Sequence, residues 1–267
     1  MAKDLPVQFQ TNLSDKDYWH GFISFYERFF AGREFFNIAE FGVLKGRSIR
    51  WLLERFPNAQ IYGADILAVQ PEWPLDPRFK FTQLDQSSKA QIHDFLGQTA
   101  FDLIIEDGSH QPQHQINCLL EGMEALKPGG MYILEDVETS LPSHPWWNQK
   151  IHWWKFSERK RQKMEQAVFS KGNAFHALLA IDHYHKINHS LDDMVIDLIS
   201  KNSLISRSQI ARLSSQIREI HLYRRTHLPL FCHNCGSEDF EFSSFKCISG
   251  KDIFQDIESM SFIVIKN

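Results

Sequence analysis

Strand-like and helix-like segments alternate regularly between residues 35 and 135. The run Phe-Asp-Leu-Ile-Ile-Glu at 101–106 is almost continuously apolar, which is typical of a strand that helices cover on both faces. Strands are expected at 35–41, 60–66, 79–84, 101–106 and 131–135, and helices at 48–55, 87–96 and 112–126. Short connections between such segments indicate a doubly wound, parallel α/β sheet, whose ligand binds at the carboxyl ends of the strands.

The segments on either side extend this core. A length of 267 residues suits one large α/β domain. Residues 15–31 are expected to form one amphipathic helix, capped by Asp15. Residues 217–224 and 261–266 alternate like an antiparallel pair of strands. We therefore expect a single domain over 1–267, with a helical extension (1–33), a core (34–137), and a part (138–267) that holds a lid, helices and a C-terminal hairpin, with a cysteine-containing insertion at about 225–258.

Charge and composition argue against some classes of binding partner. There are 29 Lys and Arg against 33 Asp and Glu, a net charge of −4, which argues against nucleic-acid binding through bulk charge. No segment approaches the roughly 18 apolar residues of a membrane span, and the first residues do not read as a signal peptide. Four cysteines are too few for a disulfide framework in a chain of this length. We expect a cytoplasmic protein without nucleic-acid or membrane partners; whether it forms a homo-oligomer is left open.

The turn after the first expected strand carries ligand-binding features. Glu40 and Gly42 stand at the strand tip, where a glycine lets the backbone approach a ligand closely. Gly46 ends the turn, and Ser48 is expected to cap the following helix. The spacing is neither the glycine fingerprint of a dinucleotide site nor a P-loop. A carboxylate in this position suits a ligand that carries positive charge and no pyrophosphate.

Two later strand ends extend the same site. Asp65 lies 23 positions after Gly42, close to the roughly 20 positions at which an acidic residue receives ribose hydroxyls in Rossmann-type sites. Asp85 and Gln86 follow the third strand and are expected to contact an adenine edge.

With these residues, the chain resembles the class I S-adenosylmethionine-dependent methyltransferases. The resemblance implies that Glu40-x-Gly42 is the first cofactor motif, that Asp65 is the ribose acid, and that residues 34–137 form the cofactor-binding core. It also implies a Rossmann-like, seven-stranded, mostly parallel sheet that ends in an antiparallel hairpin. Val43-Leu44-Lys45 departs from the glycine-rich first loop of the wider superfamily, so the cofactor contacts there are expected to differ.

Carboxylates and a histidine follow two neighbouring strands. Asp107 comes after the fourth strand with His110 three residues later, and Glu135 and Asp136 come after the fifth. Three carboxylates that share a small space need a cation to stay ionised. Oxygen ligands favour a hard ion such as Mg²⁺. His110 is then placed to act as a general base near neutral pH.

This pattern is similar to that of the metal-dependent macrolide sugar O-methyltransferases of the mycinamicin and macrocin type. The resemblance implies that Asp107, Glu135 and Asp136 bind Mg²⁺, that His110 is the base, and that the substrate is a glycosylated small molecule. Three alternatives stay open: an unmetallated site in which Asp107 orients a ligand, O-methylation of a catechol-like or other small diol, and a non-catalytic methyltransferase-fold partner protein.

Other residues have weaker signals. Cys232, Cys235 and Cys247 fit a thiol-containing insertion loop better than a zinc site, which would need a fourth ligand such as His227 or His233. His114 is expected on a helix surface. The loop at 142–156 holds Trp146, Trp147, Trp153 and Trp154, either as core packing or as an aromatic lid over the substrate.

Overall fold

The computed structural model describes residues 14–141, 172–188, 191–226, 228–232, 235–241, 243–244, 246–248, 250 and 259–267. The tryptophan-rich loop, including Trp146, Trp147, Trp153 and Trp154, lies outside the described residues, as do His227 and His233.

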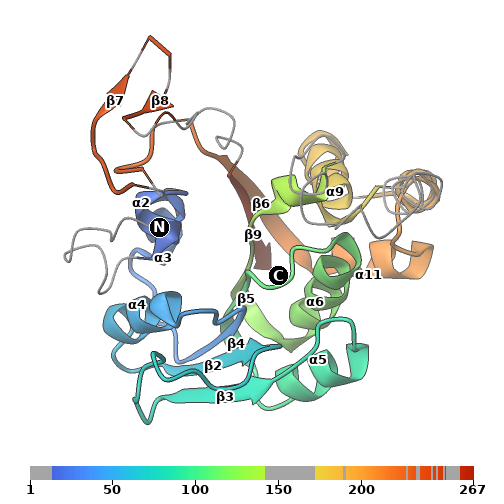
Figure 1. Cartoon of the computed structure of the whole chain (residues 1–267). Coiled ribbons are helices and arrows are strands. Elements are labelled where there is room, and N and C mark those ends of the chain that lie inside the picture. Colours follow the sequence, from blue (N-terminus) through green and yellow to red (C-terminus); the bar gives the residue numbers. More distant parts are fainter. Residues whose placement is uncertain are drawn as a thin grey trace, which may run out of the picture.

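A seven-stranded sheet forms the centre of the molecule, with the order β3-β2-β1-β4-β5-β9-β6 (Figure 1). The first five strands in the chain are parallel, and β9 runs antiparallel to both β5 and β6. This confirms the predicted α/β class with its C-terminal hairpin. The strands are β1 (Asn37–Phe41), β2 (Gln60–Asp65), β3 (Phe79–Gln83), β4 (Phe101–Glu106), β5 (Leu126–Leu134), β6 (Ile217–Arg224) and β9 (Met260–Lys266).

Helices cover both faces of the sheet (Figure 1). The sheet therefore separates two hydrophobic cores. Alternate side chains of β4 enter different cores: Leu103 and Ile105 pack on one face of the sheet and Ile104 on the other, and all three are fully buried. One face is covered by α3 (Phe22–Phe30) and α4 (Arg47–Arg55). The other is covered by α5 (Lys89–Leu96), α6 (Pro112–Ala125), α9 (Ala174–Asn188), α10 (Asp193–Lys201) and α11 (Arg207–Gln216).

The N-terminal segment differs from its prediction. Instead of one helix over 15–31 there are two, α2 (Asp15–Tyr18) and α3, separated by Gly21 with a φ of 69°. A glycine adopts this left-handed conformation at little cost, so the chain can turn sharply there. Ser14, not Asp15, caps α2 by accepting a hydrogen bond from the Lys16 amide. The turn allows α2 to bury Lys16 at the carboxyl ends of the strands.

A helical turn and two short strands complete the description. The helical turn η1 (Val137–Ser140) follows β5. The strands β7 (Phe240–Glu241) and β8 (Lys246–Cys247) pair in a separate small hairpin, whose segment lies next to α2 in Figure 1. None of the helices in the part of the chain that the structure describes combines the length and the hydrophobicity of a membrane span.

Candidate active site

A cavity of about 1000 Å³ opens at the carboxyl ends of the parallel strands. Its volume is at the upper end of the usual range for small-molecule sites. It brings together most of the residues predicted from the sequence: Gly42, Ser48, Asp65, Asp85, Gln86, Asp107, His110 and Asp136. Glu40, Gly46 and Glu135 lie outside the lining, whereas the lining includes four residues that were not predicted to belong to the site: Ser14, Lys16, Tyr18 and His114.

Gly42 allows two strand-end loops to cross at very short range. Its φ is 90°, and a Cβ atom there would lie 2.0 Å from the backbone oxygen of Asp107. Its amide donates to the carbonyl of Ala64 on β2 (2.8 Å). A side chain is therefore excluded at Gly42 by both the backbone angle and the space. The loops after β1 and β4 can share one cavity wall because this residue is a glycine.

Asp65 fixes the loop that follows β1. Its Oδ2 accepts hydrogen bonds from the amides of Val43 (2.8 Å) and Leu44 (2.9 Å), and its Oδ1 accepts one from the amide of Leu67 (2.9 Å). These bonds hold Leu44 at a φ of 48°, a conformation that non-glycine residues rarely adopt. The predicted ribose acid thus also shapes the cavity wall.

Glu40 lies behind that wall. It is fully buried, accepts a hydrogen bond from Ser48 Oγ (2.9 Å), and lies 3.5 Å from Lys16 Nζ. Burial raises the pKa of Glu40 to about 7, although Lys16 and Ser48 act to lower it. The prediction that Ser48 caps its helix is wrong: Gly46, with a φ of 68°, occupies the N-cap of α4 without a side-chain bond. The Ser48 hydroxyl is used to hold Glu40 instead.

Gln86 joins the ends of β3 and β4. Its Nε2 donates to Glu106 Oε1 (2.7 Å), and its Oε1 accepts from the amide of Ser109 (2.7 Å). Its side-chain amide is therefore engaged within the protein, and the residue supports the loop that leads to His110. Asp85 accepts a hydrogen bond from the amide of Ser87 (2.8 Å), which lowers the pKa of its carboxyl.

Lys16 occupies the centre of the carboxylate cluster, a position that the sequence did not predict for it. Its Nζ lies 2.5 Å from Asp107 Oδ2 and 2.6 Å from Glu135 Oε2. Burial alone would lower the pKa of this ammonium, but the three neighbouring carboxylates more than offset that effect and raise the pKa well above its usual value. Lys16 therefore neutralises part of the negative charge of the carboxylates, which a metal ion alone was expected to neutralise.

His110 lies between two carboxylates. Its Nε2 is 3.9 Å from Asp107 Oδ1 and 3.7 Å from Asp136 Oδ2. Ligand atoms of these three side chains all lie within 4.8 Å of one another. His110 and Asp136 have φ values of 54° and 50°, and left-handed residues of this kind gather at functional sites. Glu135 is fully buried and faces Lys16, so its Oε2 is already engaged.

Two further histidines border the site. His20 Nδ1 lies 2.7 Å from Ser259 Oγ and 3.8 Å from Asp136 Oδ1. His114 Nδ1 lies 2.8 Å from Ser109 Oγ, and its partial burial lowers the pKa of its imidazole. His114 lies on helix α6 and is half-buried, and it is one of the residues that line the cavity.

The carboxylate oxygens of the cluster are suited to a cation. Asp136 Oδ1 and Glu135 Oε1 are buried and accept no hydrogen bond from any residue that the structure describes. Lys16 uses one oxygen of Asp107 and one of Glu135, which leaves the second oxygen of each carboxylate for another partner. Buried anionic oxygens without donors are costly unless a positive group reaches them. The donor set therefore fits a hard divalent ion.

Comparison with known proteins agrees with this geometry. Residues 39–137 match the family model described as a methyltransferase domain. Over 137 residues, the chain is 31% identical to 8-demethyl-8-alpha-L-rhamnosyl tetracenomycin-C 2'-O-methyltransferase of Streptomyces olivaceus, a match that covers 48% of this chain and 36% of the relative. It is 32% identical to mycinamicin VI 2''-O-methyltransferase of Micromonospora griseorubida over 137 residues, which is 45% of this chain and 32% of the relative. The match thus spans about a third of the length of these relatives.

Solved structures show the same fold. The MycE methyltransferase from the mycinamycin biosynthetic pathway, in complex with Mg and SAH, superimposes with a TM-score of 0.53 at 19% identity and covers 94% of this chain and 50% of that chain. Its complex with Mg, SAH and mycinamycin VI superimposes with a TM-score of 0.54 at 20% identity and the same coverage. The chain therefore has the fold of the class I S-adenosylmethionine-dependent methyltransferases, and its residues 39–137 resemble the methyltransferase domain of enzymes of the mycinamicin type.

Proposed function

We propose that this protein is an S-adenosylmethionine-dependent O-methyltransferase that methylates a sugar hydroxyl of a glycosylated natural product, with Mg²⁺ and a histidine base. The observation that carries the proposal is the position of His110 between Asp107 and Asp136, in the same cavity as Gly42 and Asp65. Relatives that are about 30% identical carry names of sugar O-methyltransferases, which supports the same class of substrate.

The cofactor is expected at the part of the cavity formed by the ends of β1, β2 and β3. A carboxylate offers about four acceptor positions, and three of those on Asp65 are used by backbone amides. One position on Oδ1 is left for a ribose hydroxyl. Ile66 and Leu67 line the cavity with exposed apolar side chains, which suit the face of an adenine ring. When bound, S-adenosylmethionine supplies an electrophilic methyl group on a sulfonium sulfur.

The metal is expected at the other part of the cavity. Asp107 and Asp136 would hold Mg²⁺, together with the oxygen of Glu135 that Lys16 does not use. A bound Mg²⁺ supplies positive charge that lowers the pKa of a coordinated hydroxyl. Burial raises the pKa of Glu135 and of Asp107, whereas Lys16 acts to lower both and holds the two carboxyl groups in place, so that the cluster is assembled before the metal and substrate arrive.

His110 is expected to take the proton of the attacking hydroxyl at Nε2. Oxygens of Asp107 and Asp136 lie 3.9 Å and 3.7 Å from this nitrogen and would stabilise the imidazolium that results. Most of the remaining rate enhancement in such a transfer comes from orientation of the two reactants and from fixed charge. In this chain the fixed groups are the carboxylate cluster and Lys16.

The proposal is tested by methyl transfer to defined acceptors. The full chain is incubated with S-adenosylmethionine, Mg²⁺ and a panel of rhamnosyl and other deoxysugar glycosides, and products are analysed by mass spectrometry. We expect one added methyl group on a sugar, and a loss of about 10²- to 10⁴-fold in kcat for His110→Ala with cofactor binding retained. Transfer to catechol but to no glycoside would favour the diol alternative. Absence of transfer to every acceptor, with the cofactor bound, would contradict the proposal.

A further inference from the structure

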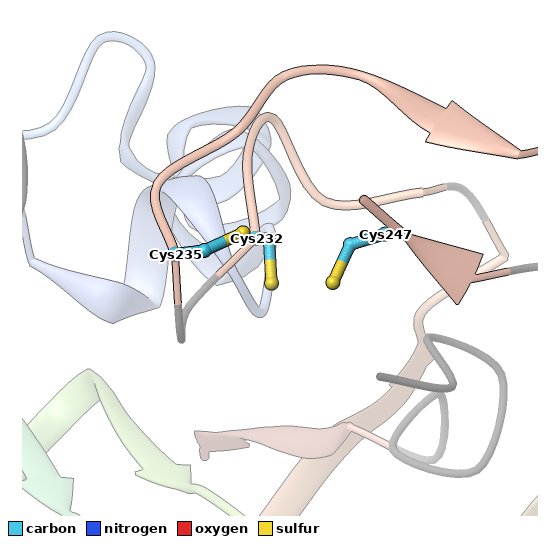
Figure 2. A group of neighbouring side chains, drawn as sticks. All are labelled: Cys232, Cys235 and Cys247. Carbon is cyan, nitrogen blue, oxygen red and sulfur yellow. The ribbon is translucent and has the colours of Figure 1, made fainter. Parts of the chain in front are cut away.

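Three cysteines meet in a region that the proposed reaction does not use. The Sγ atoms of Cys232, Cys235 and Cys247 all lie within 4.8 Å of one another. Figure 2 shows the side chains of Cys232 and Cys235 leaving one turn while Cys247 approaches from β8. Cys232 and Cys247 are 1% and 3% exposed, respectively. The sequence favours a simple thiol-containing loop here, but in the structure the three sulfur atoms form one cluster.

The backbone around the cysteines is built of two tight turns. The amide of Gly236 donates to the carbonyl of Cys232 (2.7 Å), and the amide of Cys232 donates to the carbonyl of Ser237 (2.8 Å). The amide of Gly250 donates to the carbonyl of Cys247 in the same way (2.8 Å). Gly236 and Gly250 have φ values of 67° and 79°, which glycine adopts readily. Each turn thus presents its cysteine toward the other turn.

The arrangement suits a metal better than a disulfide. A tetrahedral Zn²⁺ with bonds of about 2.3 Å to sulfur holds its thiolates about 3.8 Å apart, so a small inward shift of the side chains would complete the contacts. A disulfide would require one pair to close to about 2.05 Å and would leave the third thiol unused. Soft thiolates select Zn²⁺ over the hard Mg²⁺ expected at the carboxylate cluster.

We propose that Cys232, Cys235 and Cys247 bind one Zn²⁺ as thiolates and that this ion fixes the insertion against helix α2. The three thiols lose their protons when the ion binds. The fourth position of the tetrahedron is taken by a donor other than these three cysteines. This inference does not depend on the proposed reaction, because it concerns separate residues.

Contacts next to Cys232 connect the cysteine cluster to the helix that carries Lys16. Phe231 stacks on Tyr18 with ring centroids 4.1 Å apart, and the amide of Leu230 donates to the carbonyl of Tyr18 (2.8 Å). Tyr18, Trp19 and Phe231 form a small buried cluster, against which Phe240 of β7 packs. Tyr18 is on the same short helix as Lys16, which reaches the carboxylate cluster. The zinc-bound segment therefore supports the helix that positions Lys16.

The first test is metal binding by the full chain, purified under reducing conditions. We expect one zinc per chain by elemental analysis, and a thiolate-to-cobalt charge-transfer band when Co²⁺ replaces it. Cys232→Ser and Cys247→Ser should each weaken metal binding at least tenfold. Cys118→Ala is the matched control, because Cys118 lies on α6 outside the cluster, and it should retain the full stoichiometry. No tight zinc in the wild-type chain, or binding that survives both serine variants, would overturn the proposal.

The second test uses the unmutated protein, so that a folding defect cannot explain the result. Amide hydrogen exchange is compared between the zinc-loaded chain and the chain stripped with a chelator. We expect faster exchange in 228–248 and in α2 after zinc is removed, with the central strands unchanged. Identical exchange in α2 in the two states would contradict the supporting role of the ion. In a separate preparation that is purified without a reductant or a chelator, a disulfide within the cluster in place of bound zinc, found by mass spectrometry, would contradict the zinc site itself.

Discussion

The ammonium of Lys16 donates a 2.6 Å hydrogen bond to the buried carboxylate of Glu135, a residue 119 positions later in the chain. The same ammonium bonds to Asp107. An N-terminal helix of four residues, α2, is therefore tied to the ends of two central strands through one side chain. The positive charge of the candidate active site is in part built into the protein.

Replacement of Lys16 should destabilise the fold strongly. Lys16→Met removes the ammonium but keeps an unbranched side chain, so Asp107 and Glu135 lose their buried partner. Loss of one member of a buried ion pair costs about 3–5 kcal/mol, and we expect a decrease of that size in the free energy of unfolding measured with urea.

A surface pair provides the control for this measurement. Lys186 pairs with Asp182 on α9 at 2.6 Å, but its side chain is 69% exposed. Lys186→Met should cost only about 0.3–0.5 kcal/mol. Equal effects of the two variants would show that Lys16 is not a buried partner of the carboxylates.

Glu40 should make stability depend on pH. Its pKa is about 7 in the folded protein, against a usual value of 4.5, so the folded state holds a proton that the unfolded state releases. Between about pH 4.5 and about pH 7 the unfolded state binds fewer protons than the folded state, so stability falls as pH rises through this range. Above about pH 7 this contribution no longer changes with pH. The expected contribution is about 1–3 kcal/mol.

Glu40→Gln isolates this contribution, because glutamine does not titrate and can still accept the hydrogen bond of Ser48. Urea unfolding of both proteins across this pH range should show that the wild type loses stability relative to the variant as pH rises. A constant difference between the two proteins at every pH would contradict a raised pKa at Glu40.

Gly42 should tolerate no side chain. In Gly42→Ala, the added Cβ would meet the Asp107 backbone oxygen at 2.0 Å, and its φ of 90° is unfavourable for alanine. We expect loss of cofactor binding and a drop in melting temperature. Gly32→Ala is the control: its φ is 73°, but no atom lies within 4 Å of the added Cβ, so only a backbone penalty of about 1 kcal/mol is expected. Similar melting curves for the two variants would contradict the close crossing at Gly42.

The carboxylate cluster should bind Mg²⁺ through Asp136. Activity should be lost in excess EDTA and restored by added Mg²⁺, and Asp136→Ala should weaken Mg²⁺ binding in a calorimetric titration at least tenfold. Asp182→Ala, on the surface of α9, should leave Mg²⁺ binding unchanged. Activity that persists in EDTA and in Asp136→Ala would exclude a catalytic metal at this cluster.

Local pattern predicted the sheet well, because each buried parallel strand is a separate apolar run in the sequence. The strand at 101–106 has the predicted bounds, and helix α6 differs from its predicted range by one residue. The strand β5 begins at Leu126, before the predicted start at 131, and has a register shift against β4. Pairing with a neighbouring strand extends β5 beyond its apolar run.

The site was only partly predictable. Asp107, His110 and Asp136 meet because parallel strands place their ends at one edge of the sheet. Lys16 could not be found in this way, since it comes from a polar helix whose direction depends on the turn at Gly21. The bond from Ser48 to Glu40 was also not predictable from local sequence. A hydrogen bond from the Ser48 hydroxyl stabilises the buried carboxyl group of Glu40 more than a capping bond would stabilise α4.

Cofactor binding is best measured by a calorimetric titration of S-adenosylhomocysteine into the full chain with Mg²⁺ present. We expect one-to-one binding with a micromolar Kd, and at least tenfold weaker binding by Gly42→Ala, whose added Cβ would clash with the loop after β4 beside the cavity. If the wild-type protein does not bind the ligand at millimolar concentration, it is not an S-adenosylmethionine-dependent methyltransferase.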